Sequence, residues 1–160
     1  MEMITVTING KNYTVEKGCT VLDAARAAKI DIPTLCYLKD INQIGACRMC
    51  MVEVKGARSL VAACVYPVNE GMEVFTNTPK VVQSRKMTLE MLLSVHDKKC
   101  LTCKRSGNCE LQTMARALNI HHQPYQPKIE RLRLNFEVPI VRDATKCIKC
   151  MRCVQVCDKI

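Results

Sequence analysis

The N-terminal segment alternates between apolar and polar residues with a period of two. MITVTI at residues 3–8 and KNYTV at 11–15 have the pattern of half-buried strands. Asn9-Gly10 lies between them and is a strong signal for a tight two-residue turn. We therefore predict a β-hairpin at the start of the chain.

The pattern then changes to a helical period. Thr20 has the character of an N-cap, with Asp23 in the first turn, and VLDAARAAKI predicts a helix to about Lys29. Further strands are expected from the apolar stretches MVEV (51–54), LVAA (60–63) and EVFT (73–76). Strands on either side of one helix and a long loop predict an α+β fold, with a mixed sheet covered by that helix.

A second region begins near Pro79. KVVQSRKMTLEMLLSV (80–95) predicts an amphipathic helix ending close to His96, and CELQTMARALN (109–119) predicts a shorter helix. The stretch 120–140 contains three prolines and predicts an extended linker. We expect a division into residues 1–78, 79–120, a linker over 121–140 and a cysteine-rich segment over 141–160.

Cysteine is 12 of 160 residues, a level typical of a chain held by disulfides or by metal. Disulfides need an oxidising compartment, and the N-terminus MEMITVTING has no secretory-signal pattern. No apolar run approaches the roughly 18 residues of a membrane span. These observations favour metal binding in a cytoplasmic protein without a membrane span.

The formal net charge of +9 raises the question of nucleic-acid binding. The basic residues are scattered, however, and aromatic residues make up 4% of the chain, too few for a base-stacking surface. Iron–sulfur clusters with their thiolates carry about −1 to −2 each. Several clusters would offset much of the positive charge, so we expect no nucleic-acid partner.

The first cysteine group has spacing x10, x2, x13 and lies mainly in a long loop. Four thiolates, two for each iron, are what a [2Fe–2S] cluster needs, and small Gly45 and Ala46 would let backbone N–H groups approach the sulfurs. A four-cysteine zinc site is the alternative, but such sites usually show two Cys-x2-Cys pairs. The spacing favours [2Fe–2S] ligation by Cys36, Cys47, Cys50 and Cys64.

Three stretches after the predicted hairpin and helix carry a family resemblance. In chain order they are DIPTLCYLKD, GACRMCMVEV and AACVYPV. The chain resembles the N-terminal region of the large iron–sulfur subunit of NADH dehydrogenase (complex I). It is equally similar to that region of multi-subunit [FeFe]-hydrogenases and of NAD(P)-linked formate dehydrogenases. The resemblance runs over essentially the whole chain. It implies a ferredoxin-like β-grasp [2Fe–2S] domain, followed by a small helical [4Fe–4S] domain.

A histidine and three cysteines form the second group, with spacing x3, x2, x5. This pattern resembles the motif of the same family in which one histidine and three cysteines hold a [4Fe–4S] cluster. The resemblance implies that the ligands are His96, Cys100, Cys103 and Cys109. A neutral imidazole would leave the site about one unit less negative than four thiolates. His121 and His122 lack such a context and are assigned to the linker.

The third group, CIKCMRCVQVC, has the spacing of a bacterial ferredoxin run and predicts a further [4Fe–4S] cluster. Cys147, Cys150 and Cys153 are the expected ligands. If the following residues are helical, Cys157 lies one turn beyond Cys153 and suits a neighbouring cluster better. We then expect a partner subunit or further sequence to supply the fourth ligand, and the segment alone to be poorly ordered. The alternative is that Cys157 closes the site. Cys19 is outside all three groups and is expected to pack at the helix start.

No Gly-rich dinucleotide motif, P-loop or acid–base motif is present, so we expect no substrate-turnover site in these residues. The predicted function is electron relay in a multi-subunit oxidoreductase. The resemblance implies flavin- and NAD(P)-binding partner subunits, with a ferredoxin, hydrogenase, formate or second nicotinamide site at the other end. Two alternatives remain: an N-terminal piece of a larger catalytic hydrogenase or dehydrogenase subunit, and a zinc-stapled interaction module.

Overall fold

The computed structural model of the chain describes residues 2–127 and 133–160. It contains two compact units, one formed by Met1–Arg85 with Met151–Ile160 and the other by Lys86–Cys150. Within the described ranges, no helix has the length and apolar character needed to cross a membrane.

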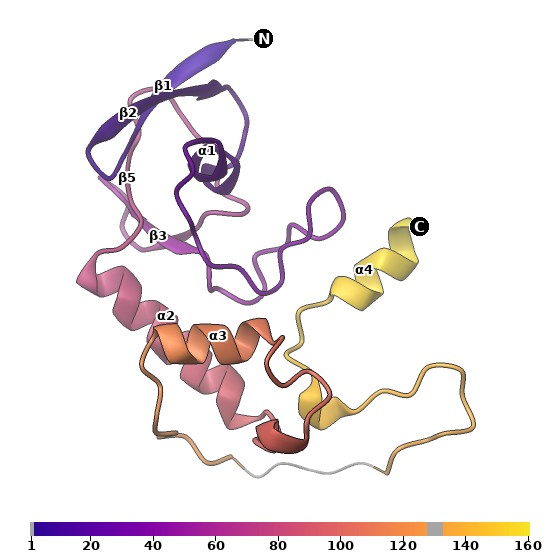
Figure 1. The fold of residues 1–160 in the computed structure, drawn as a ribbon. Helices are drawn as coiled ribbons and strands as arrows, with labels where there is room; N and C mark the ends of the chain where they lie inside the picture. Colours follow the sequence, from indigo (N-terminus) through magenta and orange to yellow (C-terminus); the bar gives the residue numbers. More distant parts are fainter. Residues whose placement is uncertain (1, 128–132) are drawn as a thin grey trace. The chain divides into compact units, whose positions relative to one another are not determined.

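A five-stranded mixed sheet forms the first unit (Figure 1), as the alternating segments predict. Its strand order is β2-β1-β5-β3-β4, and the β1–β5 pair is parallel whereas the other pairs are antiparallel. The last strand in sequence therefore enters the middle of the sheet, beside the first. The strands are β1 (Met3–Ile8), β2 (Lys11–Glu16), β3 (Met51–Val54), β4 (Val61–Ala62) and β5 (Glu73–Phe75).

The predicted N-terminal hairpin is confirmed. β1 and β2 pair in antiparallel register from Met3 opposite Glu16 to Ile8 opposite Lys11. Asn9 and Gly10 both have positive φ, 52° and 80°, as a type I′ turn requires. This turn matches the right-handed twist of the strands, which explains why Asn-Gly is found here.

Helix α1 (Val21–Ala27) begins at the predicted N-cap. The Thr20 side chain accepts a hydrogen bond from the Asp23 backbone N–H, and the Asp23 carboxylate accepts one from the Thr20 N–H, which completes a capping box. The helix ends two residues before the predicted Lys29. Lys29 adopts φ +57°, and the backbone bonds from Lys29 and Ile30 back to Arg26 and Ala25 close the helix.

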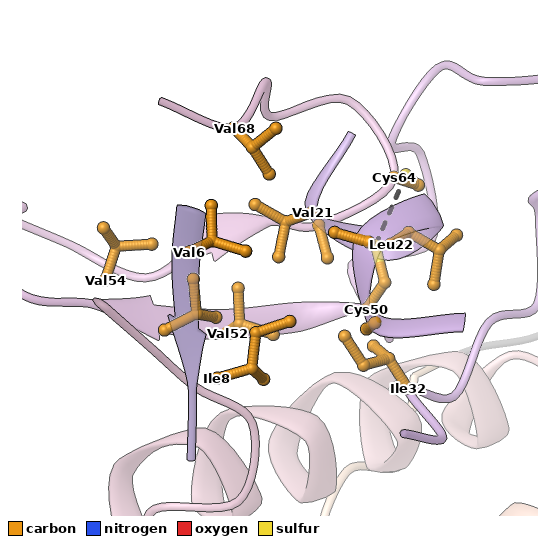
Figure 2. Packing of buried hydrophobic residues seen from close by; sticks show 14 of the residues in the cluster. Val6, Ile8, Val21, Leu22, Ile32, Cys50, Val52, Val54, Cys64 and Val68 are labelled. Atoms are coloured by element: carbon orange, nitrogen blue, oxygen red, sulfur yellow. Dashed lines mark hydrogen bonds between the residues drawn. The ribbon is translucent and has the colours of Figure 1, made fainter. Parts of the chain in front are cut away.

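The core of the first unit lies between α1 and the sheet (Figure 2). Val21 and Leu22 from α1 are fully buried with Val6 of β1 and Val52 of β3, and each such side chain stabilises the fold by about 1.5–3 kcal/mol. Backbone N–H groups in the first turn of α1 also donate to the loop after β4, from Val21 to Tyr66 and from Leu22 to Ala63. The helix start is therefore fixed to the segment that carries Cys64.

Helices α2 (Pro79–Ser94) and α3 (Glu110–Ala117) correspond to the two predicted helices. α2 begins in the first unit and continues into the second, where it ends two residues before His96. α3 belongs to the second unit. Short 3-10 turns occur at Cys100–Thr102 and Ala144–Lys146. In the described parts of the predicted linker, residues 120–127 and 133–140, there is no helix or strand. Residues 128–132 of the linker lie outside the described residues.

The C-terminal residues form helix α4 (Arg152–Lys159), which belongs to the first unit. The helical geometry on which the sequence argument about Cys157 depends is therefore present. Cys153 and Cys157 lie in α4, one turn apart, and both are exposed. α4 donates three hydrogen bonds to the loop between α1 and β3.

Replacing Thr20 with Ala should lower the free energy of unfolding by about 0.5–2 kcal/mol, because the Asp23 N–H loses its capping acceptor. Chemical denaturation of the cluster-free protein measures this change. Ser59→Ala, an exposed substitution in the β3–β4 turn, is the matched control and should have little effect. Equal stability of the two variants would contradict a stabilising role for the cap.

Candidate iron–sulfur sites

Four cysteines of the first unit are gathered at the edge of its hydrophobic core. They come from the loop after α1, from the residue before β3 and from the residues after β4. All four are almost completely buried, with relative exposures of 1% for Cys36, 6% for Cys47, 1% for Cys50 and 0% for Cys64. The sequence-predicted set is therefore in one environment, although its members are up to 28 positions apart.

The sulfurs of this group are arranged as two pairs. The Sγ atoms of Cys50 and Cys64 lie 3.3 Å apart (Figure 2). Cys36 and Cys47 also share a side-chain hydrogen bond, and the Cys36 backbone N–H donates to the Cys47 Sγ at 3.4 Å. Two cysteines for each of two irons is the division that a [2Fe–2S] cluster requires.

Hydrogen bonds stabilise negative charge on the Cys-x2-Cys pair. A hydrogen bond from Cys36 lowers the pKa of the Cys47 thiol, with further contributions from the backbone N–H groups of Met49, Leu35 and Cys36. The pKa of Cys50 is lowered in the same way by Cys64. The same hydrogen bonds raise the pKa of the partner thiols, Cys36 and Cys64. The environment therefore favours one thiolate in each pair, and a metal that binds all four sulfurs must displace the remaining protons.

Backbone donors also reach the Cys36 sulfur, where the sequence has small residues. The Cys36 thiol receives hydrogen bonds from the backbone of Cys47 and Ala46. Gly45 has φ +63°, so the turn here uses a conformation that suits glycine. The prediction that this small-residue segment allows N–H groups to approach the sulfurs is confirmed for Ala46.

Two further side chains hold the loop around Cys36, and sequence reasoning missed both. Asn42 is fully buried, and its Nδ2 donates to the Cys36 carbonyl at 2.8 Å. Arg152 of α4 donates from Nε to the same carbonyl at 3.3 Å and from Nη2 to the Tyr37 carbonyl at 3.0 Å. The CMRC motif contains Arg152, but nothing in the sequence connects it with a loop more than a hundred residues earlier.

The second unit encloses a cavity of about 570 Å³. All four residues of the histidine-containing group line it: His96, Cys100, Cys103 and Cys109. His121 and His122, which were predicted to belong to the linker, lie on its wall as well. The volume is within the range of sites that hold a small molecule or cofactor.

The local backbone structure positions His96 and the loop that carries the cysteines of this unit. His96 follows α2, and its Nδ1 lies 2.9 Å from the Asp97 carbonyl oxygen. If Nδ1 carries the proton, Nε2 is left to bind a metal, the arrangement usual for histidine ligands. Gly107 has φ +81° and allows the loop to turn between Cys103 and Cys109.

Positive charge surrounds this cavity. Cys109 is the N-cap residue of α3, where the helix dipole favours an anionic ligand. Five basic side chains line the cavity, with Asp97 as the acidic residue among the lining side chains; the basic ones are Lys98, Lys99, Arg105, Arg116 and Lys146. The donor set and its charges fit an iron–sulfur cluster with three thiolates.

The C-terminal cysteines are less enclosed. Cys147 and Cys150 are partly buried, and the Cys147 Sγ accepts hydrogen bonds from the Lys149 backbone N–H at 3.4 Å and from Arg142 Nη2 at 3.7 Å. Cys153 and Cys157 are exposed on α4. Cys19, next to the α1 N-cap, is partly buried and packs against the core of the first unit, in agreement with a structural role.

A site for a single metal ion would bring several ligand side chains to one point. Within residues 2–127 and 133–160, no three His, Cys, Asp or Glu side chains converge as the ligands of one metal ion would. The buried cysteines of the first unit lie in pairs instead, and the histidine and cysteines of the second unit surround a cavity.

Two family models match the chain. The model described as "2Fe-2S iron-sulfur cluster binding domain" matches residues 1–79. The model described as "NADH-ubiquinone oxidoreductase-G iron-sulfur binding region" matches residues 85–124. The first match contains the buried cysteine group, and the second contains His96 and the cysteines around the cavity.

Known proteins resemble the chain over nearly its whole length. It is 45% identical to the NADP-reducing hydrogenase subunit HndD of Solidesulfovibrio fructosivorans, over all of this chain and 28% of that protein. It is 35% identical to the NADH-ubiquinone oxidoreductase 75 kDa subunit of Reclinomonas americana, over 99% of this chain and 23% of that protein. The chain thus spans less than a third of the length of these two relatives.

A solved structure has the same fold. It is a chain of the crystal structure of an NAD+-reducing [NiFe]-hydrogenase in the H2-reduced state. The similarity has a TM-score of 0.88 at 31% identity and covers 98% of this chain and 67% of that one.

Replacing His96 with Cys should keep the [4Fe–4S] cluster and lower its reduction potential. The added thiolate carries one more negative charge, which disfavours the reduced form. An EPR-monitored redox titration measures the shift. His96→Ala should make the cluster labile, because three cysteines leave one iron without a protein ligand.

His122→Ala is the matched control, because His122 lines the same cavity but is not a predicted ligand. It should retain the cluster. An unchanged potential and spectrum in His96→Cys would show that His96 is not a ligand.

Proposed function

Because the chain belongs to the family of iron–sulfur subunits of NADH-ubiquinone oxidoreductases and NAD(P)-linked hydrogenases, we propose that it relays electrons between a flavin- and NAD(P)(H)-binding partner and a second redox site. The second site is a ferredoxin, a hydrogenase or formate site, or another nicotinamide. The observation that carries this proposal is the buried group of four cysteines, arranged as two sulfur pairs.

In this proposal Cys36, Cys47, Cys50 and Cys64 hold a [2Fe–2S] cluster, which accepts and releases one electron at a time. The paired sulfurs and their backbone donors support this assignment. The corresponding domain covers residues 1–78. The nearly complete burial of these four cysteines keeps water from the cluster ligands and limits hydrolytic loss of the metal.

His96, Cys100, Cys103 and Cys109 hold a [4Fe–4S] cluster in the region 79–120. The shared cavity, the contact of His96 Nδ1 with the Asp97 carbonyl and the basic lining support this assignment. A linker over 121–140 leads to a third cluster segment at 141–160, with Cys147, Cys150 and Cys153 as ligands. The fourth ligand there comes from a partner or from sequence outside these residues, and Cys157 serves a neighbouring cluster.

The partners in this proposal are the flavin- and NAD(P)-binding subunits of a hetero-oligomeric complex in the cytoplasm. The known relatives named above are subunits of NADP-reducing hydrogenase and NADH-ubiquinone oxidoreductase, which supports an assembly of this kind. Substrate turnover takes place in other parts of the complex, while these residues conduct electrons.

Two alternatives differ in measurable ways. A zinc-stapled interaction module would be colourless and redox-silent. A piece of a larger catalytic subunit is consistent with the length of the relatives, and the mass of the native protein distinguishes it from a small separate subunit.

The cofactor content tests the proposal directly. We expect one [2Fe–2S] and at least one [4Fe–4S] cluster, roughly six to ten irons per chain, with matching acid-labile sulfide. Anaerobic metal and sulfide analysis with an absorption spectrum provides the measurement. Stoichiometric zinc without labile sulfide would contradict an electron-relay function.

Replacing Cys157 with Ala tests the third cluster. We expect the number of [4Fe–4S] clusters counted by EPR in the reconstituted chain to stay the same, because Cys157 does not complete the site of Cys147, Cys150 and Cys153. Cys19→Ala is the control for loss of an unrelated thiol. A stable third cluster in the isolated chain that disappears only in Cys157→Ala would identify Cys157 as the fourth ligand.

A further inference from the structure

Arg85 occupies a buried position in the middle of α2. Val81, Arg85 and Leu89 are spaced four residues apart and so share one face of the helix. Val81 and Leu89 are fully buried, and Arg85 is only 5% exposed. A permanently charged side chain thus occupies a position on the buried face of the helix, where an apolar side chain is expected.

The described residues provide few partners for this charge. Arg85 Nη2 donates to the Met51 carbonyl at 2.7 Å, while Arg85 Nε is buried without a hydrogen-bond partner in the described part of the chain. The ion pairs found among the described residues, Lys17–Glu2 and Lys55–Glu73, do not include Arg85. A buried cation without a carboxylate is unfavourable unless another negative group is close.

The cysteine site supplies such a group. Met51, which binds Arg85, directly follows Cys50 in the chain. Burial lowers the pKa of the Arg85 guanidinium, whereas negative charge on Cys50 and on the exposed Asp31 raises it. A [2Fe–2S] cluster with four thiolates carries about −2 when oxidised and one further negative charge when reduced.

We propose that Arg85 is the buried counter-charge of the [2Fe–2S] cluster and raises its reduction potential. The inference rests on the proposed function, because it assigns that cluster to Cys36, Cys47, Cys50 and Cys64. A fixed cation stabilises the reduced, more negative state more than the oxidised state, and low exposure to water preserves the effect. Arg85 thus tunes the cluster without being a ligand.

The test compares two substitutions in the reconstituted full chain. Arg85→Gln removes the charge and keeps an N–H donor for the Met51 carbonyl, whereas Arg85→Lys keeps the charge. In an EPR-monitored titration, Arg85→Gln should lower the equilibrium constant for reduction of the [2Fe–2S] cluster about tenfold, a fall of 59 mV for a one-electron couple. Arg85→Lys should stay close to the unmodified chain.

Arg58→Gln is the matched control, since it removes an exposed arginine from the turn between β3 and β4 of the same unit. Water and salt screen that charge, so the potential should barely change. The proposal is overturned if Arg85→Gln shifts the potential no more than Arg58→Gln. It is also overturned if Arg85→Lys shifts the potential as far as Arg85→Gln or fails to hold the cluster.

Thermal unfolding separates this role from a purely structural one. A structural role predicts that Arg85→Gln lowers the unfolding midpoint equally with and without the cluster, whereas a counter-charge predicts a larger fall in the loaded protein. If Arg85→Gln folds without metal but cannot load the cluster that Arg85→Lys holds, the proposal is supported. If neither variant folds without metal, Arg85 serves the fold and the proposal fails. Absence of any [2Fe–2S] cluster in the unmodified chain would instead overturn the proposed function.

Discussion

The burial of four cysteine sulfurs in a small core is the constraint on which the first unit depends. Thiolates are costly to bury, so each must receive hydrogen bonds or face a positive charge. The loop from residue 35 to 50 has no helix or strand, which leaves its backbone N–H groups available to the sulfurs. The first turn of α1 uses its own spare N–H groups to hold the segment before and after Cys64. The backbone is therefore irregular where the sulfurs need hydrogen-bond donors, and it is regular in the sheet.

The second unit compensates the negative charge of its cysteines in another way. Its cysteines are only partly buried, its proposed fourth ligand is a neutral imidazole, and basic side chains line the cavity. Water and the basic side chains screen charge there, so fewer fixed donors are needed. Two cysteine environments in one chain thus differ in solvation, and solvation is one of the factors that set the potential of an iron–sulfur cluster.

The amino-acid sequence predicts the local features well because their signals are local. Asn9-Gly10, the Thr20 cap and the period of residues 80–95 each act within a few positions, and each element was found. The cysteine groups were recognised from spacing and resemblance. The long-range contacts were missed: Arg85 with the Met51 carbonyl, Asn42 with the Cys36 carbonyl, and Arg152 with the same loop. A polar residue in a helix pattern is ordinarily assigned to the solvent face, and only the tertiary structure shows that Arg85 is buried.

Arg152 connects the helix that carries Cys153 and Cys157 with the loop that carries Cys36. It lies between Cys150 and Cys153 in the chain, and its guanidinium binds the carbonyls of Cys36 and Tyr37. At the other end of α4, Lys159 Nζ donates to the Ile41 carbonyl at 2.7 Å. The helix that carries Cys153 and Cys157 is thus attached at both ends to the loop that carries Cys36. Because the Cys36 carbonyl also accepts from Asn42, a shift of α4 changes the hydrogen bonding of a residue assigned to the [2Fe–2S] site. The ligand loop of one predicted cluster therefore positions a helix that contributes cysteines to another.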